Sequence, residues 1–591
     1  MRHELNDEQM VAVRARGNIL LTACPGSGKT RVIIHKLVHE IERLEHQSKK
    51  KVVSLTYTVR ASEEIIRRLN NLGVDCRRIW TGTIHSFCLE WIIRPYCCYL
   101  PELKRGFTIA DEAFCSELID ELKKKYSIKP VDSINQRINR DGSFVTTEPV
   151  VRELLKEYHR LLFGRRLVDF ELILYHAYRI LATYPKICQT LSKLISKICV
   201  DEYQDTQDLQ YGILSKIINA GKGETTIFFV GDIDQAIYTS LGGVAKELEE
   251  IEAEIDPLAI RELSLTGNYR STQRIIDFYR HFQNKSIPIT AVGVNRAERG
   301  MISLNKTINF ADLPEEIARL IQLSIDKGVT EDEICVLVPQ WWLITKISRK
   351  LRTLLPNVNF DASGLAPMSK NRDNLWYKLS RLFLTQPEPR LYSARYRWAA
   401  ELIHDFRVAT NMPLLDTDNP ERLLLRLINS IQSVEKEGLD FLTDSFNQFM
   451  EFFDIRLDEH PILKECWDLF FKGIESRLKD MEFNMPSDTV SFKSFYREMT
   501  GVVINTCVGV KGEEFETVIA YGLLHGYIPH WNEVFHGNPE EASKKLMYVI
   551  CSRAKNNLHL ICERGRKTQS GRSEYQINAH LATIIFDYDE I

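Results

Sequence analysis

Short apolar runs recur along the chain, and most of them are followed by a helical pattern of apolar positions. Strands that alternate with helices predict βαβ units and a parallel sheet with helices on both faces. A first set predicts one α/β module: Asn18–Ala23, Val52–Thr58, Lys197–Glu202, Thr226–Gly231 and Glu262–Leu265. A second set predicts another: Ile302–Leu304, Ile334–Val338, Val502–Thr506, Thr517–Ala520 and Leu558–Cys562.

Two long stretches interrupt this alternation. Between about Cys88 and Val168 the pattern is helical and rich in charges, and between about Ala366 and Pro486 it is helical and rich in aromatic residues. Each stretch indicates an insertion into a module. The predicted domains are residues 1–90 and 166–268 for the first module with insertion 91–165, and residues 269–365 and 500–591 for the second with insertion 366–499.

The composition is that of an ordinary globular protein, with 44% hydrophobic and 27% charged residues in a chain of 591. The sequence shows neither a secretory leader nor an apolar stretch of about 18 residues, so we expect no membrane span and a cytoplasmic location. The 13 cysteines form no CxxC pair, which argues against a zinc or iron–sulfur site and suits a reducing compartment. A net charge of −3 argues against bulk electrostatic coating of duplex, but not against a local groove for a single strand.

A glycine-rich loop follows the first apolar run, with the sequence Ala23-Cys24-Pro25-Gly26-Ser27-Gly28-Lys29-Thr30. Glycines let backbone N–H groups close around phosphates, and the following helix N-terminus adds partial positive charge. Lys29 is predicted to reach the β- and γ-phosphates of a nucleotide, and Thr30 to bind Mg²⁺. A chance glycine turn is the alternative, and the strand before the loop and the helix after it disfavour it.

Two adjacent carboxylates, Asp201 and Glu202, end another buried run. We expect Asp201 to hold Mg²⁺ through its water shell and Glu202 to orient and deprotonate the attacking water. A DExxD pattern alone is a weak signal. It becomes strong beside a P-loop and a third run that ends at Gly231-Asp232.

The order of the motifs resembles that of superfamily 1A helicases of the UvrD/Rep/PcrA type. Besides the P-loop, the matching segments are Asn6–Gln9 (Q motif), Thr56–Thr58 with Ala61 (Ia), Thr83–Phe87 (Ib), Val200–Gln207 (II), Val230–Tyr238 (III), Asn268–Ser271 (IV), Lys511–Phe515 (V) and Tyr548–Lys555 (VI). The resemblance implies two RecA-like P-loop modules (1A and 2A) with mainly helical insertions (1B and 2B), and an ATP-dependent, Mg²⁺-requiring helicase or translocase. It also implies 3′→5′ movement on single-stranded or tailed duplex DNA.

The resemblance further assigns roles in the nucleotide site. Gln9 would contact the adenine edge, Tyr269 would stack on the adenine, and Glu514 would accept from the ribose. Arg270 and Arg553 would reach the γ-phosphate, and Gln235 would sense it and couple it to the strand. Predicted catalytic residues are therefore Lys29, Glu202, Gln235, Arg270 and Arg553, and nucleotide contacts include Gln9, Cys24, Pro25, Gly26, Ser27, Gly28, Lys29, Thr30, Arg31, Tyr269 and Glu514.

For the nucleic acid, Tyr57 and Tyr238 would stack on bases with help from Phe87, and Thr83, His85 and Thr506 would contact the backbone. Each has a plainer alternative: Tyr57 and Phe87 as core aromatics, His85 as a buried and satisfied histidine. Likewise Arg270 could cap a helix and Arg553 could form a surface ion pair.

The strand-binding motifs depart from the family pattern. Ser240 and Leu241 replace an aromatic residue and an arginine, Val508 replaces a histidine, and Ala542 and Ser543 replace a glutamate pair. We therefore expect an intact ATP site with a weakened grip on DNA. Two functions compete: a repair helicase, or a regulatory ATPase subunit of a nuclease-containing anti-phage complex, similar to the compact Gabija-like helicase subunits, with the insertions as docking surfaces.

Overall fold

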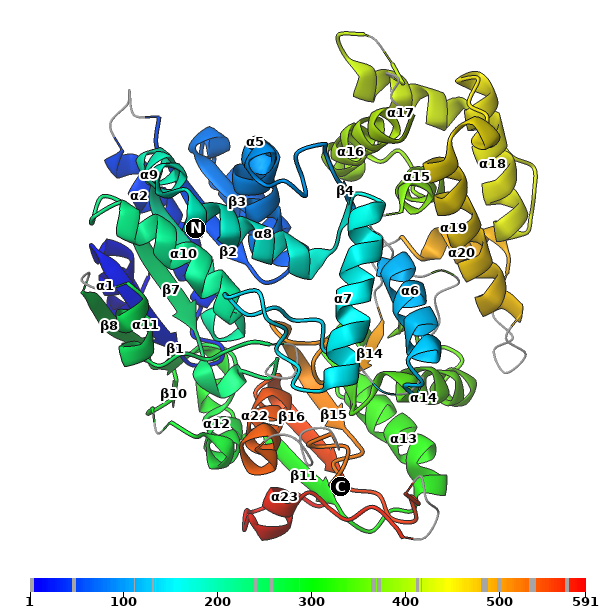
Figure 1. Cartoon of the computed structure of the whole chain (residues 1–591). Helices are drawn as coiled ribbons and strands as arrows, with labels where there is room; N and C mark the ends of the chain where they lie inside the picture. The colour runs from blue at the N-terminus through cyan, green and yellow to red at the C-terminus, as the bar shows by residue number, and fades with distance from the viewer. Residues whose placement is uncertain are drawn as a thin grey trace. The chain divides into compact units, whose positions relative to one another are not determined.

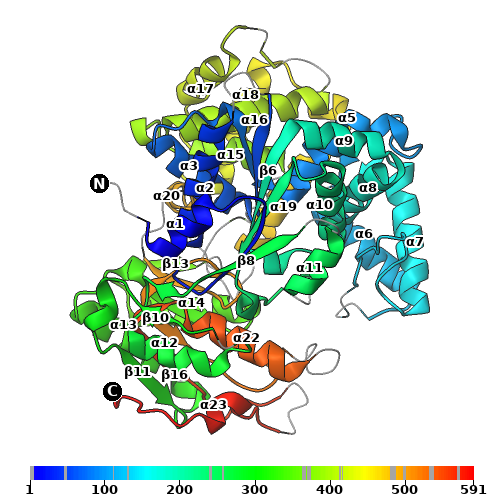
Figure 2. The ribbon, with the colours of Figure 1, turned by 90° about the vertical axis from the view of Figure 1, so that its left-hand side faces the viewer.

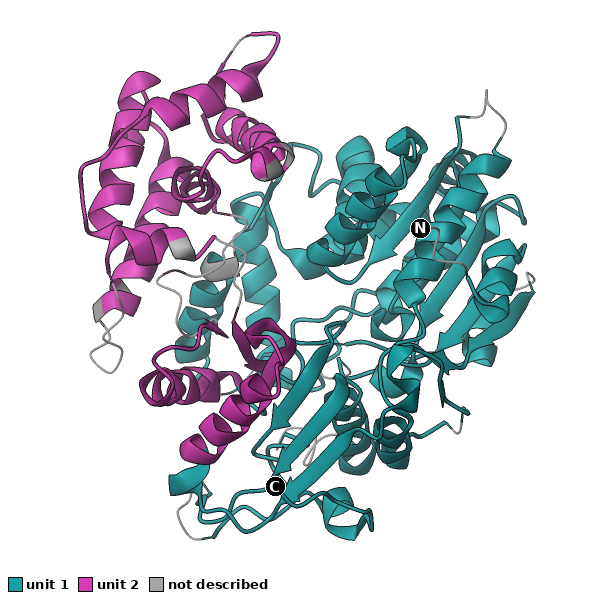
Figure 3. Cartoon of the chain, turned by 180° about the vertical axis from the view of Figure 1, so that it is seen from behind, with its two compact units in different colours: residues 1–313, 337–340, 506–591 teal, residues 314–336, 341–505 magenta. Residues whose placement is uncertain are grey.

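The computed structural model of the chain describes residues 5–44, 49–110, 112–129, 132, 134–238, 242–255, 259–285, 287–362, 368, 374–410, 414–415, 417–479, 487–496, 501–530, 538–568 and 573–591. By internal contacts these residues form two compact units, coloured separately in Figure 3. Unit 1 comprises residues 1–313, 337–340 and 506–591, and unit 2 comprises residues 314–336 and 341–505.

The first sheet has six strands in the order β3-β2-β6-β7-β1-β8, and neighbouring strands pair in parallel (Figure 1). Its central strands are buried along most of their length, as expected of a sheet with both faces covered. The strands are β1 (Asn18–Ala23), β2 (Lys51–Thr56), β3 (Ile79–Thr83), β6 (Ile195–Asp201), β7 (Thr226–Gly231) and β8 (Ile260–Leu265).

A second six-stranded sheet has the order β11-β16-β15-β12-β14-β13. Its strands are β11 (Met301–Asn305), β12 (Ile334–Val338), β13 (Phe360–Ala362), β14 (Val502–Thr506), β15 (Phe515–Ala520) and β16 (Ala554–Ile561). The registers of β11 with β16, β15 with β16 and β13 with β14 are parallel. The predicted α/β class with two parallel-sheet modules is confirmed, although β3 and β13 were not among the predicted strands.

Helices cover both faces of the first sheet. Figure 2 shows α1, α2 and α3 on one side of it and α8, α9 and α10 on the other. Alternate strand residues accordingly enter two separate apolar clusters, with Leu20 and Val53 in one and Ile19 and Val52 in the other. The principal helices of unit 1 are α1 (Asp7–Arg14), α2 (Lys29–Arg43), α3 (Val59–Asn71), α4 (Ile84–Phe87), α6 (Glu112–Lys125), α7 (Pro149–Gly164), α8 (Phe170–Thr183), α9 (Pro185–Leu194), α10 (Asp208–Ala220), α11 (Leu248–Glu254), α12 (Gln273–Tyr279) and α22 (Pro539–Cys551).

The first predicted insertion shares its core with the first sheet. Leu154 and Leu155 of α7 belong to the same buried cluster as Leu174 of α8 and Ile198 of β6. A short parallel pair, β4 (Thr108–Ile109) with β5 (Leu167–Val168), closes the segment that contains α6 and α7. These helices are therefore packed onto the first module through continuous apolar contact.

Unit 2 is mostly helical and has its own aromatic core. Trp376 is fully buried there, and its ring contacts those of Phe406, Phe446 and Trp467. Its indole N–H donates to the carbonyl of Leu463 at 2.9 Å, which satisfies the one polar atom of the side chain. The helices are α14 (Trp341–Leu354), α15 (Leu375–Leu384), α16 (Tyr392–Thr410), α17 (Pro420–Ser430), α18 (Gly438–Phe452), α19 (Pro461–Lys479) and α20 (Thr489–Ser494), and α13 spans Leu313–Asp326.

Replacing Trp376 tests how much unit 2 depends on this core. Trp376→Ala should lower the free energy of unfolding by about 3–5 kcal/mol, because it leaves a large cavity among aromatic rings. Urea unfolding followed by far-UV circular dichroism measures the loss. Leu423→Ala, at an exposed position of α17, is the control and should stay within about 0.5 kcal/mol of the parent. Equal shifts in the two variants would contradict this assignment of the core.

Candidate functional site

The glycine-rich loop between β1 and α2 has an open, cupped backbone. Gly26 and Gly28 have φ of +69° and +83°, a region that side chains strongly disfavour. A Cβ on Gly26 would lie 2.7 Å from the Cβ of Arg270, so only glycine fits there. Gly28 caps α2 without a side-chain hydrogen bond, and the hydroxyl of Ser27 is buried with no hydrogen-bond partner among the described residues. The loop therefore presents unpartnered donors at a helix N-terminus, which suits a phosphate.

Residues 268–270 hold this loop from one side. Asn268 donates from Nδ2 to the carbonyl of Pro25 at 2.8 Å, and the backbone N–H of Tyr269 donates to the carbonyl of Gly26 at 2.9 Å. Cys24 is buried and its N–H donates to Leu265 of β8. Lys29, Thr30 and Arg31 follow in the first turn of α2 and are half-buried. The predicted phosphate-binding residues thus follow one another along the loop and the first turn of α2.

The N-terminal helix approaches the same loop. Asn6 and Gln9 form a capping box at the start of α1, with each side chain accepting from the other's backbone N–H. Gln9 is 1% exposed, and its Nε2 donates to the carbonyl of Ser27 at 2.8 Å. Asn6 also donates to the hydroxyl of Tyr269 at 2.7 Å. Asn6 therefore connects the two side chains predicted to contact the adenine, a positioning role that the sequence did not indicate.

The paired carboxylates lie opposite Lys29, at the end of β6. Lys29 Nζ is 3.1 Å from Glu202 Oε2, and the backbone N–H of Glu202 donates to Asp201 Oδ1 at 3.0 Å. Burial alone would lower the pKa of Lys29, but Glu202, Asp232 and Asp201 outweigh it and raise that pKa. Burial and the charge of Glu202 raise the pKa of Asp201, whereas Lys29 and Lys511 overcome burial and lower the pKa of Glu202. Glu202 is therefore ionised, as a group that accepts a proton from water must be.

A chain of hydrogen bonds runs from Glu202 to Arg553. Gln204 donates to Glu202 Oε2 at 2.5 Å and accepts from the backbone N–H of Asp232 at 3.1 Å. Asp232 Oδ2 accepts from Gln235 Nε2 at 2.8 Å, and Gln235 Oε1 accepts from Arg553 Nη2 at 3.0 Å. We call this chain the relay; its members are Glu202, Gln204, Asp232, Gln235 and Arg553. It joins the ends of β6 and β7 to the residue that precedes β16.

The two predicted arginines differ in their partners. Arg553 is 1% exposed, and its guanidinium donates to neutral acceptors within the described residues: the carbonyls of Val549 and Glu513, the hydroxyl of Ser552 and the amide oxygen of Gln235. Burial and the nearby charge of Arg270 lower the pKa of Arg553 to about 9. Arg270 instead forms an ion pair with Glu514 at 2.7 Å and donates to the carbonyl of Ser552.

Lys511 is a member of the site that sequence reasoning missed, although it stands in a matched motif. Its Nζ is 2.6 Å from Asp205 Oδ2, and it donates to the carbonyl of Gln235 at 2.7 Å. The same ammonium lies over the ring of Tyr238, 5.0 Å from its centroid. Lys511 therefore contacts the relay and a predicted nucleic-acid residue at once. A lysine between a valine and a glycine carries no local signal of such a role.

Tyr57 and Tyr238, predicted to stack on bases, stack on each other. Their ring centroids are 4.7 Å apart with an interplanar angle of 26°, and Tyr57 is 43% exposed. Burial raises the pKa of Tyr57 to about 12. The hydroxyl of Tyr238 donates to the carbonyl of Val508 at 3.4 Å. Tyr57 is thus the more exposed ring of the pair, and Tyr238 is half-buried.

Of the other predicted nucleic-acid residues, the two threonines accept hydrogen bonds from nearby backbone N–H groups, and the two rings pack against aromatic side chains. Thr83 caps α4 by accepting from the backbone N–H of Ser86, and Thr506 accepts from the backbone N–H of Gly509. His85 lies edge-on to Phe170, and burial lowers its pKa to about 4, so the ring is neutral. Phe87 is fully buried against Trp80 and Trp91. It has no face for a base, which corrects its predicted stacking role in favour of the core alternative.

Three of the five departures from the family motifs lie among the described residues. Ser240 and Leu241 lie outside the described residues. Val508 is half-buried, and Ser543 is buried and accepts from Asn578 Nδ2 at 2.8 Å, so its place in α22 is structural. Ala542 beside it is half-buried.

Two negative findings apply to the described parts of the chain. No helix in them is long and apolar enough to cross a membrane. They also contain no group of three or more His, Cys, Asp or Glu side chains placed to bind a metal ion by themselves.

Comparison with known proteins supports the resemblance. Residues 5–256 match the UvrD/REP helicase N-terminal domain. The chain is 27% identical over 630 residues to the ATP-dependent DNA helicase PcrA of Staphylococcus aureus strain Mu50, and 23% identical over 626 residues to that of Staphylococcus epidermidis strain ATCC 12228, covering 94% of this chain and 83% of each relative. It is 27% identical over 297 residues to UvrD1 of Mycobacterium tuberculosis strain H37Rv, covering 46% of this chain and 38% of that protein. These similarities bear out the predicted resemblance to UvrD/Rep/PcrA helicases.

The buried pair of Lys511 and Asp205 predicts a pH-dependent cost of mutation. Burial raises the pKa of Asp205 to about 6 although Lys511 lowers it. At pH 8 Lys511→Ala leaves a buried, unpaired carboxylate and should cost about 3–5 kcal/mol of unfolding free energy. At pH 5 Asp205 is protonated in the folded protein and needs no cation, so the cost should be smaller.

Thermal and urea unfolding of both proteins at pH 5 and pH 8 measure this difference. Lys544→Ala is the matched control, because Lys544 is half-buried and pairs with the exposed Glu540 one helical turn away. It should cost under about 1 kcal/mol at either pH. A loss for Lys511→Ala that is equal at the two pH values would contradict the pairing.

Proposed function

We propose that this chain, a relative of the UvrD/Rep/PcrA helicases, is an ATP-driven translocase and helicase acting on single-stranded or tailed duplex DNA. ATP would be hydrolysed between RecA-like module 1A (residues 1–90 and 166–268) and module 2A (residues 269–365 and 500–591). Residues 91–165 and 366–499 are the proposed insertions 1B and 2B. The observation that carries the proposal is the relay, because it links the hydrolytic carboxylate Glu202 to the buried guanidinium of Arg553.

The chemistry follows from the groups around the glycine-rich loop. The loop N–H groups and Lys29 would bind the phosphates, and Glu202 would take a proton from the attacking water. Thr30 and Asp201 supply a hydroxyl and a carboxylate, the hard oxygen donors that Mg²⁺ prefers, so the residues fit this cation. When bound, Mg²⁺ supplies charge neutralisation at the phosphate oxygens. Lys29, already ion-paired with Glu202, would exchange this partner for phosphate and free the carboxylate.

Nucleotide selection would come from the flank of the loop. Gln9 and Tyr269, both held by Asn6, would contact the adenine edge and face. Glu514 would accept from the ribose, and its present ion pair with Arg270 suggests an exchange of partners. A γ-phosphate between Arg270 and Arg553 would give both guanidinium groups an anionic partner. Arg553 gains most, because its acceptors within the described residues are neutral.

Coupling to the strand would run through Lys511. A change at the γ-phosphate moves Gln235, whose carbonyl accepts from Lys511, and Lys511 lies over the Tyr238 ring. Tyr238 in turn stacks on Tyr57. Nucleotide state could therefore bias the aromatic pair between two arrangements, as directional stepping requires. Movement in the 3′→5′ direction is part of the proposal and follows from the relationship alone.

The tyrosine pair also favours a second candidate, a regulatory ATPase subunit of a nuclease-containing defence complex. Tyr57 and Tyr238 each give one ring face to the other, so fewer faces remain for bases. Base stacking on an aromatic side chain contributes about 1–3 kcal/mol per base. A motor whose stacking tyrosines are paired in this way would bind single strands weakly alone and would need a partner for firm contact.

Three measurements on the full chain test the proposal: ATPase activity with and without single-stranded DNA, translocation along a strand, and unwinding of a 3′-tailed duplex. Glu202→Gln should keep nucleotide binding and lower kcat about 100-fold or more, because the general base is lost. Lys29→Ala should weaken both binding and turnover. Lys186→Ala, at an exposed position of α9, is the control and should behave as the parent does.

The outcomes separate the two candidates. Strong unwinding by the chain alone supports a self-sufficient helicase. DNA-stimulated ATPase without unwinding supports the regulatory subunit. ATPase that is absent in the parent, or unchanged in Glu202→Gln, would rule out both forms of the proposal.

A further inference from the structure

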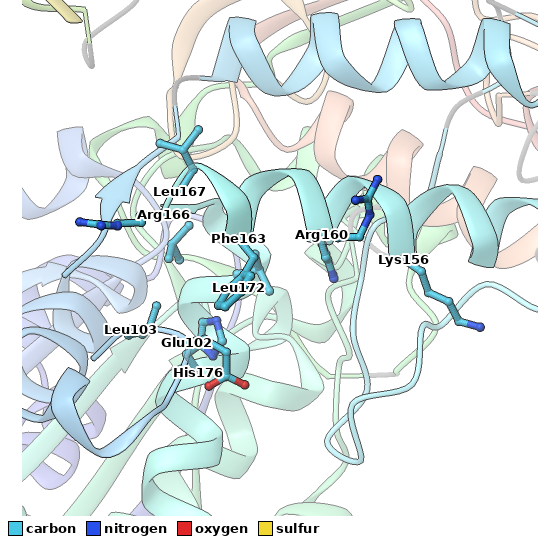
Figure 4. A pocket seen from close by; sticks show the side chains of 11 residues that line it. Glu102, Leu103, Lys156, Arg160, Phe163, Arg166, Leu167, Leu172 and His176 are labelled. Atoms are coloured by element: carbon cyan, nitrogen blue, oxygen red, sulfur yellow. The ribbon is translucent and has the colours of Figure 1, made fainter. Parts of the chain in front are cut away.

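A pocket lies away from the glycine-rich loop, between α7 (Pro149–Gly164) and α8 (Phe170–Thr183). Its cavity volume is about 310 Å³, the size of a site for one small ligand. Lys156, His159, Arg160 and Phe163 line it from one face of α7, and Leu172 and His176 line it from one face of α8. The remaining lining residues are Glu102, Leu103, Arg166, Leu167 and Val168 (Figure 4). None of these residues belongs to a helicase motif or to the relay.

Three buried polar atoms around this pocket have no hydrogen-bond partner among the described residues. They are Nε2 of His159, Nδ1 of His176 and Oε2 of Glu102. His176 is 6% exposed, so water does not reach its ring freely. Leaving such atoms unpaired is unfavourable for the folded protein. Three at one pocket indicate a ligand that completes their hydrogen bonds after small side-chain rotations.

The groups around the pocket define the chemistry of that ligand. Leu103, Phe163 and Leu172 provide apolar walls for a flat ring. Figure 4 shows Glu102 and His176 close together below Phe163 and Leu172. Lys156 and Arg160 extend along α7 on one side of this group, and Arg166 on the other.

The cationic side chains around this pocket make an anionic ligand a better occupant than a metal ion. Arg166 has no ion pair within the described residues, Arg160 is 3.6 Å from Glu157, and Lys156 is 2.7 Å from Glu153, all at the surface. The described residues include no His/Cys/Asp/Glu group placed to ligate a metal ion, although two histidines and a carboxylate line the pocket. Burial lowers the pKa of both histidines, so their rings are neutral and act as hydrogen-bonding groups.

We propose that this pocket binds a guanine mononucleotide, with the base against Phe163 and Glu102 and the phosphate beside Arg160. Glu102 Oε1 accepts from Arg179 at 2.9 Å and keeps a second lone pair, and Oε2 has no partner among the described residues, so both oxygens can accept from a ligand. Guanine presents two adjacent donors, N1–H and N2–H₂, to such a carboxylate, whereas adenine presents one donor next to an acceptor lone pair. Neutral imidazole N–H groups can donate to O6 or N7 of the same base. The carboxylate therefore selects guanine over adenine.

The binding site does not depend on the motor function, and its test can be separated from it. The full chain, saturated with a non-hydrolysable ATP analogue so that the glycine-rich loop is occupied, is titrated with GMP by calorimetry. One saturable site is expected, with AMP and inorganic phosphate each binding at least tenfold more weakly. Arg160→Glu should weaken GMP binding at least tenfold because it places an anion beside the phosphate.

Two further variants make the result decisive. His176→Leu removes the buried ring and should also weaken GMP binding at least tenfold, with circular dichroism as the check of folding. Lys186→Glu makes the same charge change on α9, outside the pocket, and should leave GMP affinity unchanged. The exposed position of Arg160 keeps the test valid even if His176→Leu fails to fold.

Several results would overturn the proposal. They are no GMP binding, AMP binding of equal strength, full displacement of GMP by inorganic phosphate, or equal affinity in Arg160→Glu and the parent. None of these results bears on ATPase activity, which is measured separately with Lys29→Ala and Glu202→Gln.

Discussion

The buried guanidinium of Arg553 is the constraint around which the candidate nucleotide site is arranged. A cation with 1% exposure is costly unless its donors are satisfied and negative charge lies near. Its donors are satisfied by neutral oxygens, and the charges of Glu202, Asp232 and Glu514 act on it from further away. The acceptors come from three places: Gln235 of the relay, Val549 near the end of α22, and Glu513, two residues after Lys511. A phosphate that reached Arg553 would replace distant compensation with direct contact.

The glycine-rich loop is held by the segment that follows the first sheet. Asn268 and Tyr269 come directly after β8 and bind the carbonyls of Pro25 and Gly26, and Arg270 occupies the space that a Gly26 side chain would need. Arg270 then reaches Glu514 and Ser552, which lie near the starts of β15 and β16. One short segment therefore connects the phosphate loop to strands of the second sheet. A movement of those strands can therefore reach the loop through this segment, as it can through the relay and Lys29.

The sequence predicted the sheets and the glycine-rich loop better than it predicted the packing of the residues proposed to contact a nucleic-acid strand. Buried parallel strands leave continuous apolar runs, and a P-loop is a local signal, so β1, β6, β7 and the loop at 23–30 were all identified. Edge strands β3 and β13 are short or half-exposed and were missed. Roles set by long-range contact, such as those of Asn6, Gln204 and Lys511, have no local pattern. Phe87 was misassigned because a motif position does not reveal burial, which three-dimensional packing against Trp80 and Trp91 decides.

The tyrosine pair limits how strongly the proposed motor could bind a strand. The free energy of stacking a base on these rings can be compared with that of the pair itself. If Tyr57 and Tyr238 must separate to admit a base, the stacking between them is lost, about 0.5–1.5 kcal/mol. Base stacking returns about 1–3 kcal/mol per base, so the net gain is small or near zero. Lys511 lies over Tyr238 and is itself bound to Asp205 and the Gln235 carbonyl, which favours the present arrangement of the pair. A nucleotide-driven shift of Gln235 that loosened Lys511 would then be enough to change which state of the groove is preferred.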